Sequence, residues 1–128
     1  MRAISMFALA ISIAGVSPAS AAAQAKPVDS ATIANARVKL RSDLRNIMTA
    51  QEAYFSDHST YAKSIAELGD FYKASKGVTI VVKGNGLKGH SATGTIDTVP
   101  GLTCAVFIGE MPPPLGTGKE AEVVCKGP

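Results

Sequence analysis

The sequence predicts an α+β fold in which one long helix packs on a small antiparallel β-sheet. Residues 30–56 contain no glycine or proline and repeat apolar side chains every three or four positions. After Gly77 the pattern changes to short β-branched runs that are separated by glycine-rich turns. A helix followed by consecutive strands is typical of an α+β domain with the helix on one face of the sheet.

The first element along the chain, residues 1–25, is predicted to be an export signal. Arg2 precedes an apolar run from Ala3 to Val16, and alanine-rich triplets between residues 19 and 25 offer the small side chains that a signal peptidase contacts. A membrane anchor is the alternative, but the run of 14 residues is shorter than the roughly 20 that span a bilayer. We therefore expect a periplasmic or extracellular protein with no stable membrane span in its mature chain.

Residues 26–128 are expected to form one domain. Removal of 25 of the 128 residues leaves 103, enough for a single modest core. Loss of Arg2 with the signal leaves 12 basic and 10 acidic residues, a net charge of +2. The lysines form no run, so no nucleic-acid partner is expected.

The predicted helix begins at Asp29 or Ser30 and runs to residue 56. Either side-chain oxygen can accept a hydrogen bond from the amides of the first turn, and a carboxylate suits the positive end of the helix dipole. Such a helix is roughly 40 Å long, more than a small domain covers. Only the second half, from Leu40 to Phe55, therefore needs to be packed, and the first turns are free to project.

Apolar side chains in this segment recur at steps of mostly three and four residues, which places them on one stripe. The stripe predicts the positions that pack against the sheet, namely Ile33, Ala36, Leu40, Leu44, Ile47, Met48, Tyr54 and Phe55. The opposite face is predicted to be solvated and carries Arg37, Lys39, Arg41, Asp43, Arg45, Asn46 and Glu52.

Turn-favouring residues 57–59 end the helix. Ser64 to Glu67 then have the spacing of a capping box, which predicts one short helical turn that stops at Gly69.

Four strands follow. Their predicted bounds are Val78–Val82 and His90–Ile96, joined by a turn at Gly84–Gly86, and then Thr103–Ile108 and Glu120–Cys125.

Cys104 and Cys125 are the only cysteines, and an exported chain with two of them has one possible intramolecular pairing. We predict a disulfide that ties the last strand to its neighbour. The loop it closes has 20 intervening residues, and closing such a loop is worth roughly 3 kcal/mol. A metal site or a reactive thiol is the alternative, but the chain has no CxxC spacing and neither histidine is close in sequence.

Several segments resemble the globular half of type IV pilins and type II secretion pseudopilins: Ser42–Ile47, Thr49–Phe55, Asp57, Tyr61 and Ile65–Leu68. The resemblance implies a pilin-like fold, in which the end of a long N-terminal spine helix is followed by a loop and a small antiparallel sheet. Ser91–Gly94 and the two cysteines look like the sheet and the disulfide-closed carboxy-terminal region of that family. The similarity extends from near Ala34 to Cys125.

The amino terminus departs from the family. Pilins keep a hydrophobic amino-terminal helix, introduced by a glycine and a Phe-Thr-Leu-Ile-Glu type motif, which anchors and polymerises them. The sequence has no such motif, and an ordinary export signal stands in its place. The resemblance therefore implies a protein that contacts pilus or secretion components but does not join a filament core by the usual route.

No catalytic constellation is evident, and we predict that the chain is not an enzyme and binds no cofactor. His58 and His90 have hydroxyl neighbours in sequence, but adjacent residues point in different directions, there is no GxSxG elbow, and both are expected at the surface. Gly84, Gly86 and Gly89 match the dinucleotide fingerprint but lie between two predicted strands, where a hairpin turn is expected. Metal-binding DxDxDG and HExxH motifs are absent.

Aromatic residues concentrate between Tyr54 and Tyr72 in a chain that has few. Tyr54 and Phe55 are expected to brace the helix against the sheet. The predicted partner surface consists of Tyr61, Phe71, Tyr72, Lys73 and Lys76. Its partner is predicted to be a protein, and the alternative is a free ligand-binding or surface-binding module for carbohydrate or DNA.

Overall fold

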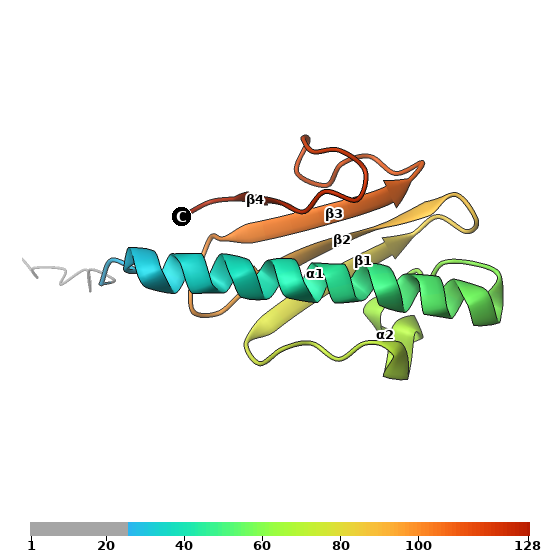
Figure 1. The fold of residues 1–128 in the computed structure, drawn as a ribbon, viewed down its shortest axis with the longest axis horizontal. Coiled ribbons are helices and arrows are strands. Elements are labelled where there is room, and N and C mark those ends of the chain that lie inside the picture. Colours follow the sequence, from blue (N-terminus) through green and yellow to red (C-terminus); the bar gives the residue numbers. More distant parts are fainter. Residues whose placement is uncertain (1–25) are drawn as a thin grey trace, which may run out of the picture.

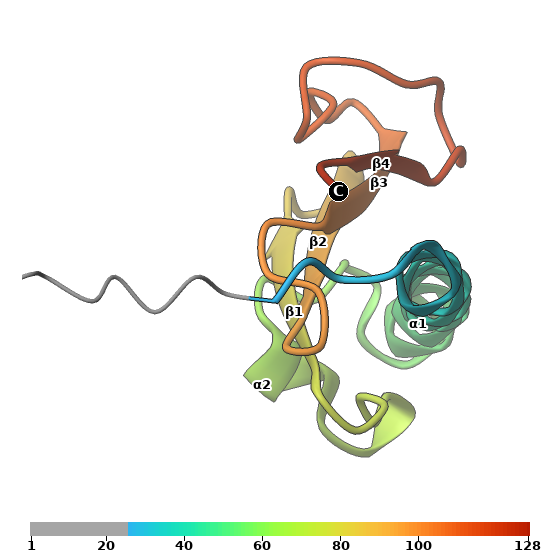
Figure 2. The ribbon, with the colours of Figure 1, turned by 90° about the vertical axis from the view of Figure 1, so that its left-hand side faces the viewer.

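The computed structural model describes residues 26–128, so the predicted export signal lies outside the described residues. The helix α1 (Ser30–His58) is followed by the short α2 (Ile65–Leu68), a 3-10 turn (Gly69–Phe71) and the strands β1 (Val78–Gly84), β2 (Gly89–Ile96), β3 (Thr103–Gly109) and β4 (Val124–Lys126). All neighbouring strands are antiparallel, in the order β1-β2-β3-β4. Viewed along α1, the helix lies on one side of this sheet (Figures 1 and 2). The predicted α+β class is confirmed.

Helix α1 is capped at both ends. The Asp29 carboxylate accepts hydrogen bonds from the Thr32 amide at 2.9 Å and the Thr32 hydroxyl at 2.7 Å. These bonds lower the pKa of Asp29, which favours the charged form at the helix amino terminus. At the other end Ser59 is left-handed, with φ 56°, and its amide donates to the Phe55 carbonyl at 2.7 Å. The helix therefore runs to His58, two residues beyond the predicted end.

The buried face of α1 packs on the middle of the sheet. Leu40, Leu44 and Ile47 are fully buried there. Close approach depends on Gly94 of β2, because a Cβ at that position would lie 3.2 Å from the Leu40 Cδ2 atom and 2.8 Å from the Ile80 Cδ1 atom. A side chain at position 94 would therefore require the ends of the Ile80 and Leu40 side chains to shift.

Packing also extends toward the start of α1. Ala36 is buried, and Val28 and Ile33 are half-buried against the core. The Arg37 guanidinium donates to the Gly127 carbonyl at 3.1 Å and to the Pro128 carbonyl at 2.8 Å. The first turns are therefore fastened to the domain, and packing begins before Leu40.

The carboxy-terminal region is closed by the predicted disulfide, which joins Cys104 of β3 to Cys125 of β4. The two cysteines are direct partners in the β3–β4 register. Strand β4 has only three residues, fewer than predicted. The segment before it forms a loop, in which Ala121 adopts a left-handed φ of 63° and donates its amide to the Phe107 carbonyl.

Candidate interaction site

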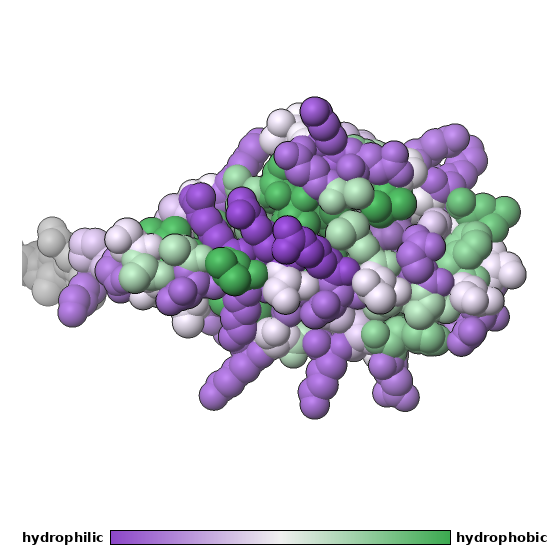
Figure 3. All heavy atoms as spheres, viewed as in Figure 1, coloured by the Kyte–Doolittle hydropathy of each residue, from purple (hydrophilic) through white to green (hydrophobic). Residues whose placement is uncertain are grey.

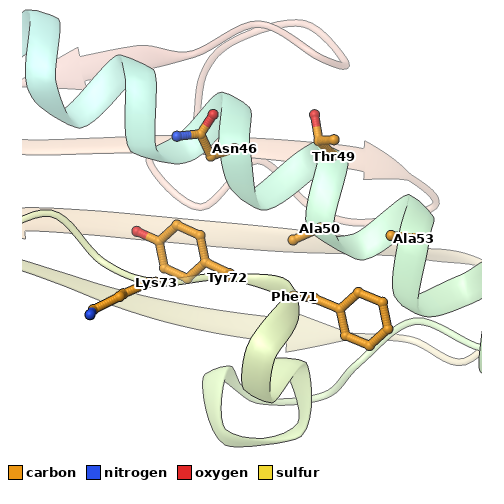
Figure 4. Close-up of a pocket in the computed structure, with 7 residues that line it drawn as sticks. All are labelled: Asn46, Thr49, Ala50, Ala53, Phe71, Tyr72 and Lys73. Atoms are coloured by element: carbon orange, nitrogen blue, oxygen red, sulfur yellow. The ribbon is translucent and has the colours of Figure 1, made fainter.

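An open groove of about 320 Å³ lies between α1 and the segment that follows the 3-10 turn. Figure 4 shows the helix above it and the aromatic residues below it. The groove is lined by Asn46, Thr49, Ala50, Ala53, Phe71, Tyr72 and Lys73.

Local structure fixes the lower wall of this groove. The Ser64 hydroxyl accepts the Glu67 amide at 3.2 Å and starts α2 as predicted, but the Glu67 carboxylate accepts the amide of Lys63 rather than that of Ser64. Leu68 is fully buried and anchors the short helix in the core. The chain then turns so that Phe71 reaches the surface at the lip of the groove with 40% of its area exposed.

A buried carboxylate holds the next residues against the helix. Asp43 is only 2% exposed and accepts hydrogen bonds from the Tyr72 hydroxyl at 3.2 Å, the Ser75 amide at 3.0 Å and the Ser75 hydroxyl at 2.7 Å. Burial, together with the Asp43 carboxylate, raises the pKa of Tyr72. The Tyr72 phenol therefore stays protonated and donates to Asp43.

The prediction that Asp43 lies on the solvated face of the helix was wrong. Spacing could have shown this, because Leu40, Asp43, Ile47 and Ala50 continue one stripe at steps of three and four residues. The charge of the residue, however, favours an exposed position. Its partners Tyr72 and Ser75 are about 30 residues away in sequence, so periodicity could not reveal them.

An aromatic cluster extends the groove toward the carboxyl end of α1. The Tyr54 and His58 rings stack with centroids 3.9 Å apart, and Phe71 meets Tyr54 edge-on at 5.9 Å. The exposed His58 is also held by a 3.0 Å hydrogen bond between its Nδ1 atom and the Tyr54 carbonyl. Phe71 is therefore part of a fixed surface and is not an isolated exposed ring.

The structure brings together Phe71, Tyr72 and Lys73 of the predicted partner surface and places the other two elsewhere. Tyr61 lies on the opposite flank of α1, where its hydroxyl donates to Glu52 at 3.1 Å and its ring contacts Phe55 at 4.7 Å. Lys76 is exposed, and its carbonyl accepts a hydrogen bond from Lys39 Nζ at 2.7 Å.

The helix wall of the groove was missed from the sequence. Its floor is formed by Ala50 and Ala53, whose methyl groups leave room for an inserted side chain. Alanine in a helix has no sequence pattern that distinguishes a groove from ordinary surface. The only usable signal was the absence of a large apolar residue between Met48 and Tyr54.

His90 is the second correction, because we expected a surface histidine and the structure buries it completely. Its ring lies 4.9 Å from that of Tyr61, and neither ring nitrogen has a hydrogen-bond partner. Burial lowers the pKa of His90 to about 4, so the imidazole is neutral at pH 7. Alternation along β2 could have shown the burial, since Ala92, Gly94 and Ile96 share its face.

No group of three or more His, Cys, Asp or Glu side chains within residues 26–128 could hold a metal ion. Among the helices in this range, none has the length and apolar character needed to cross a membrane. Comparison with protein-family models and with curated protein sequences found no match for the chain.

Proposed function

We propose that the chain is an exported, non-enzymatic, pilin-like protein that acts by contact with another protein, as an accessory of a type IV pilus or a type II secretion apparatus. The resemblance of residues 42–68 to pilins supports this proposal. The arrangement of α1 on an antiparallel sheet with a disulfide-closed end agrees with it. In this proposal α1 corresponds to the soluble end of the pilin spine helix, and the export signal replaces the half that would enter a filament.

The observation that carries the proposal is the preformed groove beside Phe71. Three hydrogen bonds to Asp43 fix its lower wall, and Ala50 and Ala53 leave its floor open. Fixed walls reduce the ordering cost that a binding surface has to overcome. In protein interfaces, the residues that contribute most of the binding energy are commonly aromatic anchors surrounded by a polar rim.

A site-specific photo-crosslinker at position 71, introduced in the producing cell, tests this assignment. We expect a covalent adduct with a pilus or secretion component, identified by mass spectrometry. The matched control is the same crosslinker at Leu87, which is 70% exposed at the tip of the β1–β2 hairpin and outside the groove. Ala53→Trp should abolish the adduct because the indole fills the groove. Equal labelling from both positions, or an adduct that Ala53→Trp leaves unchanged, would refute the groove as the contact site.

A carbohydrate-binding module is the second candidate, because the polar residues Asn46, Thr49 and Lys73 line the groove together with Phe71. A ring face with hydrogen-bonding groups beside it suits a sugar. Retention on an immobilised polysaccharide at high salt, lost in Phe71→Ala, would favour this candidate, since salt weakens contacts between exposed charges but spares aromatic contacts.

A further inference from the structure

Helix α1 carries a row of arginines whose like charges do not stabilise the helix. Arg37, Arg41 and Arg45 follow one another at intervals of four residues, so each guanidinium has a like charge one turn away. Such pairs destabilise a helix by about 0.2–0.5 kcal/mol each. The only acidic residue between Ser30 and Gln51 is the buried Asp43, which is already hydrogen-bonded on the other flank.

No acidic side chain within residues 26–128 forms an ion pair with this row. The one ion pair among the described residues joins Lys88 to Glu110, away from α1. Arg37 donates to the backbone oxygens of Gly127 and Pro128. The side chains of Arg41 and Arg45 are exposed and make no hydrogen bond or ion pair to the described part of the protein. Two guanidiniums are therefore available to an outside partner.

An apolar side chain accompanies the two free arginines. Val38 is 67% exposed, three residues before Arg41 and seven before Arg45, which places it on the same face of the helix. Figure 3 shows strongly hydrophilic atoms along α1, with a hydrophobic spot among them and further hydrophobic atoms between the helix and the loop that follows β3. The surface thus offers charge and apolar contact side by side.

We propose that Val38, Arg41 and Arg45 form a second docking surface and that its partner is an acidic protein segment, one that presents two carboxylates one helical turn apart beside an apolar side chain. Arginine suits this role because its planar guanidinium binds a carboxylate through two parallel hydrogen bonds. The face has no aromatic ring on which a nucleic-acid base could stack, and its apolar part is a single valine, too little for insertion into a membrane. This surface shares no residue with the lining of the groove at Phe71, and the proposal is independent of the function proposed for that groove.

Binding of defined probes to the full exported protein tests the proposal. The probe is a helical peptide with glutamates four residues apart around a leucine, and its counterpart carries glutamine in place of glutamate. We expect the acidic peptide to bind more tightly than its counterpart, with affinity that falls from low to high salt. Arg41→Glu with Arg45→Glu should weaken binding by about tenfold or more, because two exposed charge pairs become repulsive.

Two controls make the result specific. Lys63→Glu with Lys119→Glu makes the same change in net charge at exposed positions outside this face, and it should leave the affinity within about twofold. A peptide with lysine in place of glutamate should bind the doubly reversed arginine variant and restore most of the lost affinity. Equal loss in both double variants, no binding of the acidic peptide, or tighter binding of duplex DNA or phosphatidylglycerol vesicles would each overturn the proposal.

Discussion

Asp43 of α1 and His90 of β2 are both buried, but Asp43 has hydrogen-bond partners and His90 has none. Asp43 accepts three hydrogen bonds from Tyr72 and Ser75. His90 has no partner for either ring nitrogen. A buried polar group with partners can hold distant segments together, whereas one without partners costs its desolvation energy and gives nothing back. We infer that the Asp43 side of α1 is rigid and that the stability of the His90 side depends on pH.

The largest expected effect comes from Asp43→Ala, which removes the acceptor and leaves three donors without partners. We expect a loss of about 3 kcal/mol in the free energy of unfolding, measured by urea denaturation. Asp57→Ala is the matched control, because Asp57 is an exposed carboxylate of the same helix, and it should change stability by less than about 0.5 kcal/mol. If the two variants were equally stable, the three hydrogen bonds would not be what holds residues 72–75 in place.

The next effect concerns His90 and appears only in acid. Its pKa is about 4 in the fold against 6.5 for a free histidine. Below pH 6.5 the unfolded chain therefore binds a proton at this histidine and the folded chain does not. As a result, the free energy of unfolding falls as the pH drops from 6.5 toward 4. The loss attributable to this group is on the order of 2–3 kcal/mol. Glu52, whose carboxylate accepts from the neighbouring Tyr61 hydroxyl, acts in the opposite direction on the pKa but is outweighed by burial.

Comparison of histidine variants isolates this contribution from the carboxylates that titrate in the same range. His90→Leu keeps a side chain of similar size without ring nitrogens, so the fall in stability between pH 6.5 and 4 should become smaller by that amount. His58→Gln should leave the fall unchanged, because His58 is exposed. An acid profile of His90→Leu that superimposes on that of the unchanged protein would show that the buried imidazole is not the sensitive group.

Sequence reasoning found the backbone arrangement and missed the polar interior for one physical reason. Helix periodicity and strand alternation depend on neighbours within a few residues, so the bounds of α1, of the β1–β2 hairpin and of β3 could be predicted closely. The same periodicities place Asp43 and His90 at buried positions. Charged and polar residue types, however, favour exposed positions, and this led to the wrong prediction. What partners each has is decided by segments far away in sequence, which no local pattern contains.

The residues of the candidate groove were likewise only partly predictable from the sequence. Phe71, Tyr72 and Lys73 could be named from the sequence because aromatic residues are few and clustered there. The opposing Ala50 and Ala53 could not, because a groove is defined by what its wall lacks. Tyr61 was grouped with Phe71 by proximity in sequence, yet the intervening α2 places the two rings on different flanks of α1.

The smallest expected effect, from Tyr72→Phe, separates the fixing of the groove from its lining. This change removes one of the three donors to Asp43 and keeps the ring that lines the groove, so we expect a loss of about 1 kcal/mol in the free energy of unfolding. In a double-mutant cycle with Asp43→Ala, the phenylalanine change should then cost almost nothing, since the hydroxyl has already lost its acceptor. Additive losses would mean that the Tyr72 hydroxyl stabilises the fold through some contact other than Asp43. The rigidity of the groove would then rest on Ser75 alone, whose amide and hydroxyl still reach both carboxylate oxygens.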